Sequence, residues 1–233
     1  MMRRILSILS LLTILVAFPM HADEMPHGFE LSNVTVDPSD IASIKRGAKF
    51  FATNCMSCHT MVYLRYDKLA QEAGITYEKM PVNVKSWPYG VTPPDLSLEA
   101  DVRGVNWIYT YLHSFYQDAK RPTGANNLLI ANTAMPNIVG AFQGEQIKLD
   151  HPIVNMFGGY HYYDVLKQTK PGIMSADQFD ETIRDVVNFL DYASAPYKLE
   201  QHRLGVWVLV FIAFLGIMLY FLKREYWKDV KRK

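Results

Sequence analysis

The stretch GAKFFATNCMSCH, residues 47–59, contains both cysteines of the 233-residue chain. Cys55, Cys58 and His59 form the C-x-x-C-H pattern of c-type haem attachment. Two thiols separated by two residues can reach the two vinyl groups of one porphyrin, and the adjacent imidazole then lies beneath the iron. A redox-active thiol pair or a structural disulfide is the competing interpretation, because oxidising compartments favour both. The motif therefore predicts one covalently attached haem c, provided that helix rather than strand precedes it.

The residues before the motif have a helical pattern. Asp37-Pro38-Ser39-Asp40 offers an N-cap and a proline at a helix start, and the residues up to Asn54 contain no helix breaker except Gly47. Gly47, Phe51 and Cys55 are spaced four apart, so they share one face of this helix. A redox C-x-x-C pair would instead begin a helix after a strand. The helical pattern favours haem attachment over a redox pair.

A glycine on a helix face lets a second helix approach closely. Residues 176–193 have the amphipathic pattern expected of that partner, and this pairing places Phe189 near Gly47. The Gly-x-x-x-Phe-x-x-x-Cys-x-x-Cys-His pattern resembles the N-terminal helix of class I cytochromes c, where it crosses a C-terminal helix. We therefore expect a mainly α fold: a class I cytochrome c-like haem domain with long loops, plus one C-terminal transmembrane helix.

The first 22 residues have the layout of a secretory signal peptide. Arg3 and Arg4 precede an apolar run over residues 5–18, which is about 21 Å of helix and is short for a bilayer core of roughly 30 Å. A cut after Ala22 is imperfect, because Met20 stands where a small residue is preferred. The sequence predicts a signal peptide over residues 1–22, with an uncleaved N-terminal anchor as the alternative.

A second apolar segment, residues 204–222, contains no charged residue. Its nineteen residues make about 28 Å of helix, which matches the bilayer core, so we expect it to span the membrane rather than to form a buried core helix. Residues 223–233 are strongly basic, and basic residues beside a span stay in the cytoplasm. We expect residues 23–203 to form one periplasmic domain on a bacterial inner membrane, with a cytoplasmic C-terminus.

The predicted outer domain is acidic. Between residues 23 and 202 the chain has 15 Lys and Arg against 21 Asp and Glu, a net charge of −6, although the whole chain has a net charge of +1. An acidic face would steer a basic partner toward the domain, and it disfavours nucleic-acid binding, which needs a basic face. The alternative is that mild acidity only aids solubility.

The function of a haem depends on the ligand on the far side of its iron, because an open position permits gas binding or catalysis. Met135 is the leading candidate, since it lies in Asn132-Thr133-Ala134-Met135-Pro136 between small residues and a proline that fixes the course of the loop. Met80 also precedes a proline but lies only about twenty residues after His59. Less favoured candidates are Met156, Met174, His113, His151 and His161.

The order of these motifs resembles the cytochrome c1 family, the haem subunits of quinol:cytochrome c reductase (cytochrome bc1) complexes, in their short proteobacterial form. The resemblance covers nearly all of the predicted mature chain, and no single motif in it is specific beyond C-x-x-C-H. Its other elements are Thr60-Met61-x-Tyr63-x-x-Tyr66, Pro94-Asp95-Leu96-Ser97, Arg103, Pro122-Thr123-Gly124, Asn126, Ala134-Met135-Pro136 and the terminal span with its basic tail.

The resemblance implies a set of site residues. His59 and Met135 would be the axial ligands of the haem iron, and Arg103 would bind a haem propionate, which a guanidinium can grip with two hydrogen bonds. Pro94 and the three residues after it would help to wall the haem pocket. The alternatives are a surface arginine and an ordinary proline-rich loop. Residues 141–172 depart from the mitochondrial pattern and have no assigned role.

The resemblance also implies a partner set. The haem would receive an electron from a Rieske iron-sulfur protein and pass it to a cytochrome c, within a membrane complex that also contains cytochrome b and is dimeric. Any enzyme label would belong to the whole complex, since the chain shows no independent catalytic site. One rival is a free-standing, membrane-tethered cytochrome c, and another is a haem sensor with an open iron position.

Overall fold

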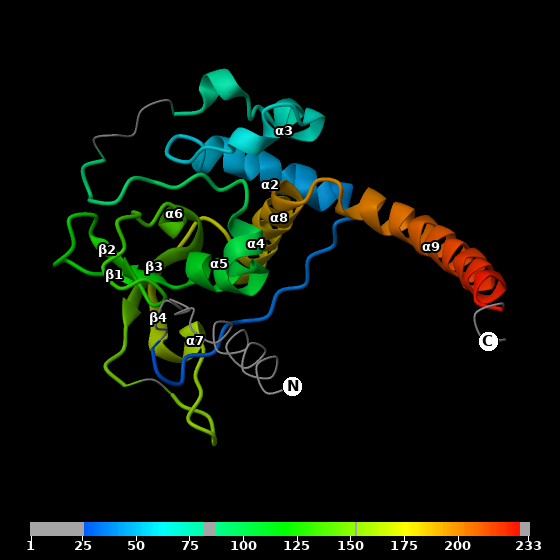
Figure 1. Cartoon of the computed structure of the whole chain (residues 1–233). Helices are drawn as coiled ribbons and strands as arrows, with labels where there is room; N and C mark the ends of the chain where they lie inside the picture. The colour runs from blue at the N-terminus through cyan, green and yellow to red at the C-terminus, as the bar shows by residue number, and fades with distance from the viewer. Residues whose placement is uncertain (1–25, 82–86, 152, 229–233) are drawn as a thin grey trace, which may run out of the picture.

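The computed structural model describes residues 26–81, 87–151 and 153–228, so the expected signal peptide lies outside the described residues. The described chain is mainly α-helical, as the sequence predicts, and a single long helix projects from its domain (Figure 1). The helices of the domain are α2 (Ile41–Asn54), α3 (Lys68–Ala73), α4 (Glu99–Arg103), α5 (Val105–His113), α6 (Gly140–Gln143), α7 (Tyr162–Val165) and α8 (Ala176–Ser194), with short 3-10 turns at Val62–Leu64 and Tyr77–Lys79.

The crossing of α2 and α8 is the most extensive contact in the domain. The N-cap of α2 is Asp40, whose side chain accepts a hydrogen bond from the Ser43 N–H at 2.9 Å, which satisfies one of the free donors at the helix start. α8 begins with a capping box, in which Ser175 and Gln178 bond each other's main chain. Both helices that the sequence predicts are therefore confirmed.

Gly47 lies at the point where α2 meets α8. A Cβ at this position would be 2.0 Å from the Asp185 main-chain oxygen and 2.9 Å from the Phe189 Cβ, so only a glycine fits. On either side of this point, the Phe51 and Phe189 rings pack with centroids 5.6 Å apart, and Arg46 grips Asp185 with two bonds of 2.6 and 2.8 Å. The predicted proximity of Gly47 and Phe189 is confirmed.

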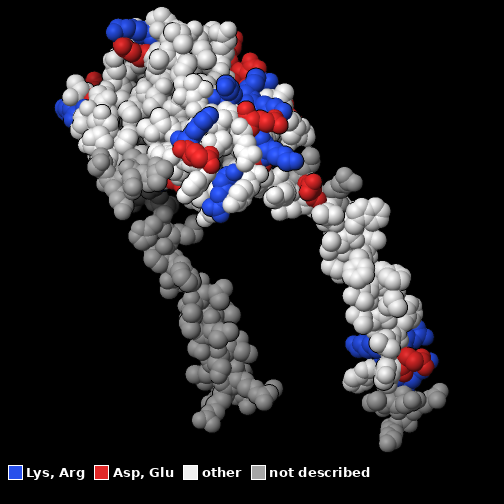
Figure 2. Space-filling view, turned by 90° about the horizontal axis from the view of Figure 1, so that it is seen from above, with Lys and Arg blue, Asp and Glu red and all other residues white. Residues whose placement is uncertain are grey.

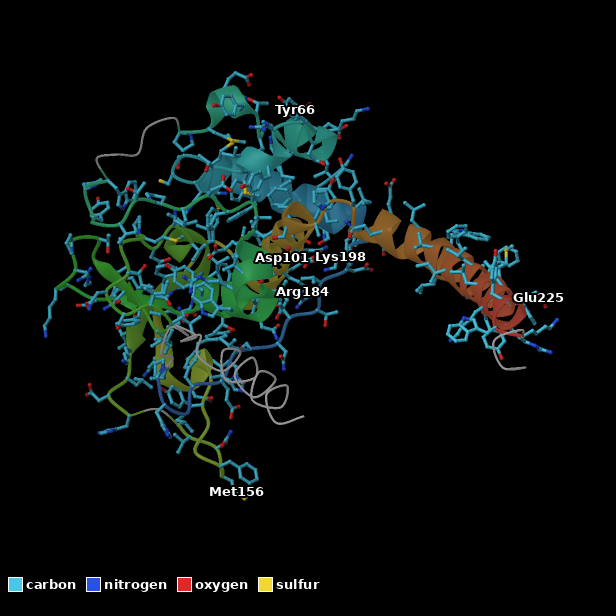
Figure 3. The ribbon with its side chains drawn as sticks, viewed as in Figure 1. Tyr66, Asp101, Met156, Arg184, Lys198 and Glu225 are labelled. Atoms are coloured by element: carbon cyan, nitrogen blue, oxygen red, sulfur yellow. The ribbon has the colours of Figure 1, made fainter. Side chains whose placement is uncertain are left out.

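Two small antiparallel sheets extend the domain beyond the helices. β1 (Phe115–Gln117) follows α5 and pairs with β2 (Ala125–Asn127), while β3 (Gly144–Lys148) pairs with β4 (Leu166–Pro171) across an irregularity between Glu145 and Gln146. The second hairpin falls within residues 141–172, the segment that has no role in the sequence analysis. Its long connection forms a loop that projects from the domain, with Met156 at its exposed tip (Figure 3).

The C-terminal helix α9 (Lys198–Tyr226) stands away from the domain. Within the candidate span Leu204–Tyr226, the most apolar stretch of 18 residues has a mean hydropathy of 2.5, and none of that stretch is buried against the rest of the protein. Figure 2 shows this shaft as an uncharged rod that ends in a cluster of charged side chains, among them Lys223, Arg224 and Lys228. Nineteen apolar residues on all sides of an exposed helix fit a single-pass membrane anchor.

Candidate functional site

The C-x-x-C-H motif begins where α2 ends. Cys55 is the C-cap residue, and its carbonyl accepts hydrogen bonds from the Cys58 N–H at 3.1 Å and the His59 N–H at 3.0 Å. This tight turn follows directly from the helix end, so the α2–α8 crossing fixes the direction in which the motif leaves the domain core. Both cysteines are free thiols, which does not favour the structural-disulfide interpretation.

The electrostatic setting of Cys55 also disfavours a redox-active pair. Burial, with a smaller effect from Cys58, raises the pKa of the Cys55 thiol to about 12. A thiol that attacks disulfides needs the opposite shift, because the thiolate is the reactive form. A neutral, half-buried thiol beside an apolar core is instead compatible with a thioether.

The His59 side chain is 9% exposed and is held in a fixed orientation. Its Nδ1 lies 2.8 Å from the carbonyl oxygen of Pro94, and because a carbonyl only accepts, Nδ1 must be the protonated nitrogen. The other ring nitrogen, Nε2, therefore keeps its lone pair. Burial lowers the pKa of His59, although the Pro94 bond and the Glu99 and Asp95 charges act in the opposite direction. The ring is neutral and suited to bind a metal through Nε2.

Pro94 is held in place by the residues that follow it. The Asp95 carboxylate accepts hydrogen bonds from the Thr60 hydroxyl at 2.6 Å and the Val62 N–H at 2.9 Å, and the Leu96 N–H donates to the Thr60 carbonyl at 2.9 Å. Burial raises the pKa of Asp95, but these bonds and those from Ser97 outweigh it, so the pKa is lowered overall. The segment 94–97 is thus bound to the segment just after His59.

Arg103 is the last residue of α4, the helix that follows the segment 94–97. Its Nε donates to the Glu99 carboxylate at 3.0 Å, and its guanidinium carbon lies 4.4 Å from the centre of the Trp107 ring. The Glu99 charge also acts on His59, and Arg103 and Glu99 both act on the Tyr111 hydroxyl. Arg103 is therefore linked through Glu99 to the charges that act on His59, while its role toward a propionate stays a prediction.

Met135 is half-buried against the domain core. Its main-chain N–H donates to the Thr133 hydroxyl at 3.3 Å, and that hydroxyl lies 2.9 Å from the hydroxyl of Tyr111. Tyr111 stacks on Trp107, with ring centroids 5.0 Å apart and planes within 8°. A continuous series of contacts therefore joins Arg103 to the Met135 loop through α5.

The other candidate ligands are placed less favourably. Met156 is 90% exposed at a loop tip, whereas Met80 is 4% exposed and belongs to the apolar core. The Nδ1 of His113 lies 2.8 Å from the Tyr109 carbonyl, and its ring packs among aromatic rings of α5, α7 and α8. Met174 packs against the core near Thr182, and His161 contacts the Glu30 main chain. Met135 remains the prediction for the sixth ligand.

Sequence reasoning missed several residues that organise this site. Glu99 and Trp107 hold Arg103, and Tyr111 joins α5 to the Met135 loop. The spacing of four within each helix, Glu99–Arg103 in α4 and Trp107–Tyr111 in α5, is the signal that could have identified these pairs, because residues four apart on one helix share a face. The contact between Arg103 and Trp107 crosses the break at Gly104, so helical spacing does not predict it.

The residues present fit a covalently bound haem. Two thiols in one turn, an imidazole with its Nδ1 proton bonded to a carbonyl, and a thioether on the Met135 loop match the donor set of a haem with histidine and methionine ligands. The core that surrounds the motif is apolar, since Met56, Met61 and Leu64 are all buried.

Known proteins are similar to this chain over most of its length. The Cytochrome C1 family matches residues 31–87 and 84–230. The chain is 39% identical to "Cytochrome c1" of Allochromatium vinosum, over 87% of this chain and 91% of that protein. It is 34% identical to "Ammonia monooxygenase gamma subunit" of Nitrosomonas europaea, over 94% and 97% of the two chains. It is 24% identical to "Cytochrome b/c1" of Bradyrhizobium diazoefficiens, over 82% of this chain and 34% of that protein.

Proposed function

Because the chain belongs to the cytochrome c1 family, we propose that it is the electron-transfer haem subunit of a quinol:cytochrome c reductase complex. In this role it accepts electrons from a Rieske iron-sulfur protein and passes them to a cytochrome c. The observation that supports the proposal best is the geometry of His59, whose Nδ1 proton is bonded to the Pro94 carbonyl, so that Nε2 keeps its lone pair for a metal. A histidine fixed in this way is prepared for a metal.

The residues would divide the work as follows. Cys55 and Cys58 would hold the haem covalently, and His59 and Met135 would be the axial ligands of its iron. When bound, the haem supplies one-electron oxidation and reduction, and a histidine–methionine pair gives it a relatively high potential. Pro94 fixes the tautomer and the angle of the His59 ring. Arg103, already stacked on Trp107, would bind a propionate through its guanidinium.

The chain would act inside a membrane assembly. α9 would anchor it in the inner membrane by residues 204–222, with the domain in the periplasm and the basic tail, residues 223–233, in the cytoplasm. The name of the Bradyrhizobium relative, "Cytochrome b/c1", couples the two cytochromes, and this supports cytochrome b as a neighbour. We expect the complex to be dimeric. The acidic outer domain would favour the approach of a basic cytochrome c.

Co-purification tests this proposal. The full chain, carrying an affinity tag on its C-terminus, is extracted in a mild detergent, and the eluate is examined for b-type haem by absorbance and for a Rieske cluster by electron paramagnetic resonance. We expect both signals together with covalently bound haem c. Elution of the chain with haem c alone would contradict the proposal and favour a free-standing tethered cytochrome.

The same experiment addresses a second assembly. The relative named as an ammonia monooxygenase subunit is similar over nearly its whole length, so membership of a monooxygenase assembly is the alternative to consider. Ammonia monooxygenase subunits in the eluate, identified by mass spectrometry and without b-type haem, would support that alternative. Carbon monoxide binding to the reduced, unaltered chain at a rate that Met135→Leu does not raise would instead support an open-site sensor.

A further inference from the structure

The loop that carries Met135 is tethered at successive residues. Asn132, three positions earlier, adopts a left-handed backbone with φ of 62°, which is uncommon for any residue but glycine. Arg121 holds it there by donating to its carbonyl at 2.8 Å and to its side-chain oxygen at 3.2 Å. The Asn126 side chain accepts from the Asn132 N–H at 2.8 Å. The loop therefore enters the site in a fixed direction.

The next tether comes from α5. The hydroxyls of Tyr111 and Thr133 share a hydrogen bond of 2.9 Å, and Thr133 in turn accepts from the Met135 N–H at 3.3 Å. Tyr111 and Thr133 are 8% and 4% exposed, so water has little access to either hydroxyl. The Tyr111 hydroxyl is therefore connected to the main chain of Met135 through a single group, the Thr133 hydroxyl.

Tyr111 is itself held rigidly. Its ring stacks on Trp107 and meets the edge of Phe115 with centroids 5.1 Å apart, while its carbonyl accepts from the Asn127 side chain at 2.8 Å. Burial raises the pKa of Tyr111 to about 12, so the hydroxyl stays protonated at neutral pH. A rigid, neutral hydroxyl is well suited to fix the position of another group.

We propose that Tyr111 is a positioning residue for the Met135 thioether, acting through Thr133 to hold the ligand loop in its binding conformation. This proposal rests on the proposed function in one respect, the assignment of Met135 as the sixth ligand. Tyr111 touches neither the iron nor the thioether sulfur in this scheme. Its effect is on the fraction of molecules in which the loop keeps Met135 in place.

The Tyr111→Phe substitution removes the hydroxyl and leaves the aromatic stack intact. It also leaves the Thr133 hydroxyl buried with one partner fewer, which destabilises the closed loop relative to an open one in which water reaches Thr133. A buried neutral hydrogen bond changes such an equilibrium about fivefold to tenfold. We expect the population with Met135 displaced to rise by that factor.

Carbon monoxide is the probe for the displaced population. The full chain is purified in detergent with its haem attached and reduced, and the rate of carbon monoxide binding is measured by stopped flow. Because the gas binds only when Met135 is displaced, Tyr111→Phe should bind it about fivefold to tenfold faster than the unaltered chain. In the oxidised protein, the weak long-wavelength charge-transfer band of methionine-ligated haem should lose intensity.

Two further variants make the result specific. Tyr192→Phe is the matched control, because the Tyr192 hydroxyl donates to Asp67 at 2.7 Å in another part of the domain. It should lower thermal stability without changing carbon monoxide binding. Thr133→Val breaks the Tyr111 bond from the other side and tests the same contact if Tyr111→Phe does not fold. The double variant should be less affected than the two single effects combined, since neither hydroxyl is then left unpaired.

The possible outcomes separate this proposal from the ligand assignment. Met135→Leu should abolish the charge-transfer band, and if the band persists, Met135 is not the ligand and the positioning role is overturned with it. If Met135→Leu abolishes the band but Tyr111→Phe and Thr133→Val bind carbon monoxide at the unaltered rate, only the positioning role is overturned. An equal acceleration in Tyr192→Phe would also overturn it, because the effect would then be general loosening.

Discussion

Gly47→Ala tests whether the helix crossing holds the domain together. In an ordinary helix this change stabilises by about 1 kcal/mol, because alanine has the higher helix propensity. Here the added Cβ would lie 2.0 Å from the Asp185 oxygen and 2.5 Å from its carbonyl carbon. Ordinary carbon contacts are about 3.5 Å, so α2 and α8 would have to separate by about 1.5 Å.

The steric effect should outweigh the helix propensity. Overpacking in a close-packed core costs about 1–3 kcal/mol, and the atoms in the way belong to the backbone of α8, which cannot rotate aside as a side chain can. Separation would also weaken the Phe51–Phe189 packing and the Arg46–Asp185 ion pair. Taking the upper end of the overpacking cost, we expect a net loss of about 2 kcal/mol.

Thermal unfolding of the full chain in detergent, followed by near-ultraviolet circular dichroism, measures this loss. A domain of this size loses about 2–4 °C in Tm for each kcal/mol, so Gly47→Ala should unfold about 4–8 °C lower. Gly216→Ala is the matched control, because its Cβ would meet no atom within 4 Å. An unchanged or raised Tm for Gly47→Ala would show that the close approach of the two helices is wrong.

Three further predictions concern the anchor, the surface charge and a buried histidine. Deleting residues 204–233 should release a soluble domain with haem attached, because the core helices and both cysteines precede the span; the absorbance of the soluble fraction measures this. Reduction of a basic cytochrome c should slow as salt rises, because attraction between exposed charges is screened beyond about 8–10 Å at physiological ionic strength; stopped-flow rates measure this. Burial lowers the pKa of His113 from 6.5, against weaker opposite effects of the Tyr109 carbonyl and Asp180. As pH falls, the unfolded chain therefore binds a proton at His113 before the folded chain does, and the stability of the fold should decrease below about pH 6.5. His113→Gln should reduce this decrease, and Tm measured against pH tests it.

Each of these has an outcome that would contradict it. A truncated chain that cannot hold haem after export would mean that the helix is more than a tether. A rate independent of salt would remove the case for acidic steering, although not for electron transfer. If His113→Gln and the unaltered chain lose Tm equally between about pH 7 and pH 5, the acid sensitivity does not come from His113.

The sequence was most informative where local chemistry determines local structure. The N-cap at Asp40, the glycine at Gly47 and the amphipathic pattern of residues 176–193 predicted both long helices of the domain and their contact. Each signal acts over a few residues, through a capping bond, a missing Cβ or a 3.6-residue period. The sequence also predicted a helix over the apolar segment of residues 204–222, and in the structure this helix extends from Lys198 to Tyr226.

The contacts that complete the site could not be predicted from the sequence. His59 is oriented by the main-chain carbonyl of Pro94. Because every residue has a main-chain carbonyl, no residue type in the sequence indicates this hydrogen bond. The Tyr111–Thr133 bond joins side chains 22 positions apart, and the left-handed backbone of Asn132 is held by Arg121 and Asn126, which lie 11 and 6 positions earlier. The β3–β4 hairpin within residues 141–172 also escaped prediction, since its strands lack a regular alternation of buried and exposed residues.

Reduction of the haem by quinol tests the central claim most directly. Membranes that contain the full chain are solubilised in mild detergent, the tagged complex is oxidised and mixed with a quinol, and the absorbance of covalently bound haem c is followed by stopped flow. We predict rapid reduction that stops when an inhibitor of the quinol-oxidation site is added. Haem that stays oxidised in the presence of quinol, in a preparation that contains b-type haem and the Rieske cluster, would contradict the proposed role of this chain.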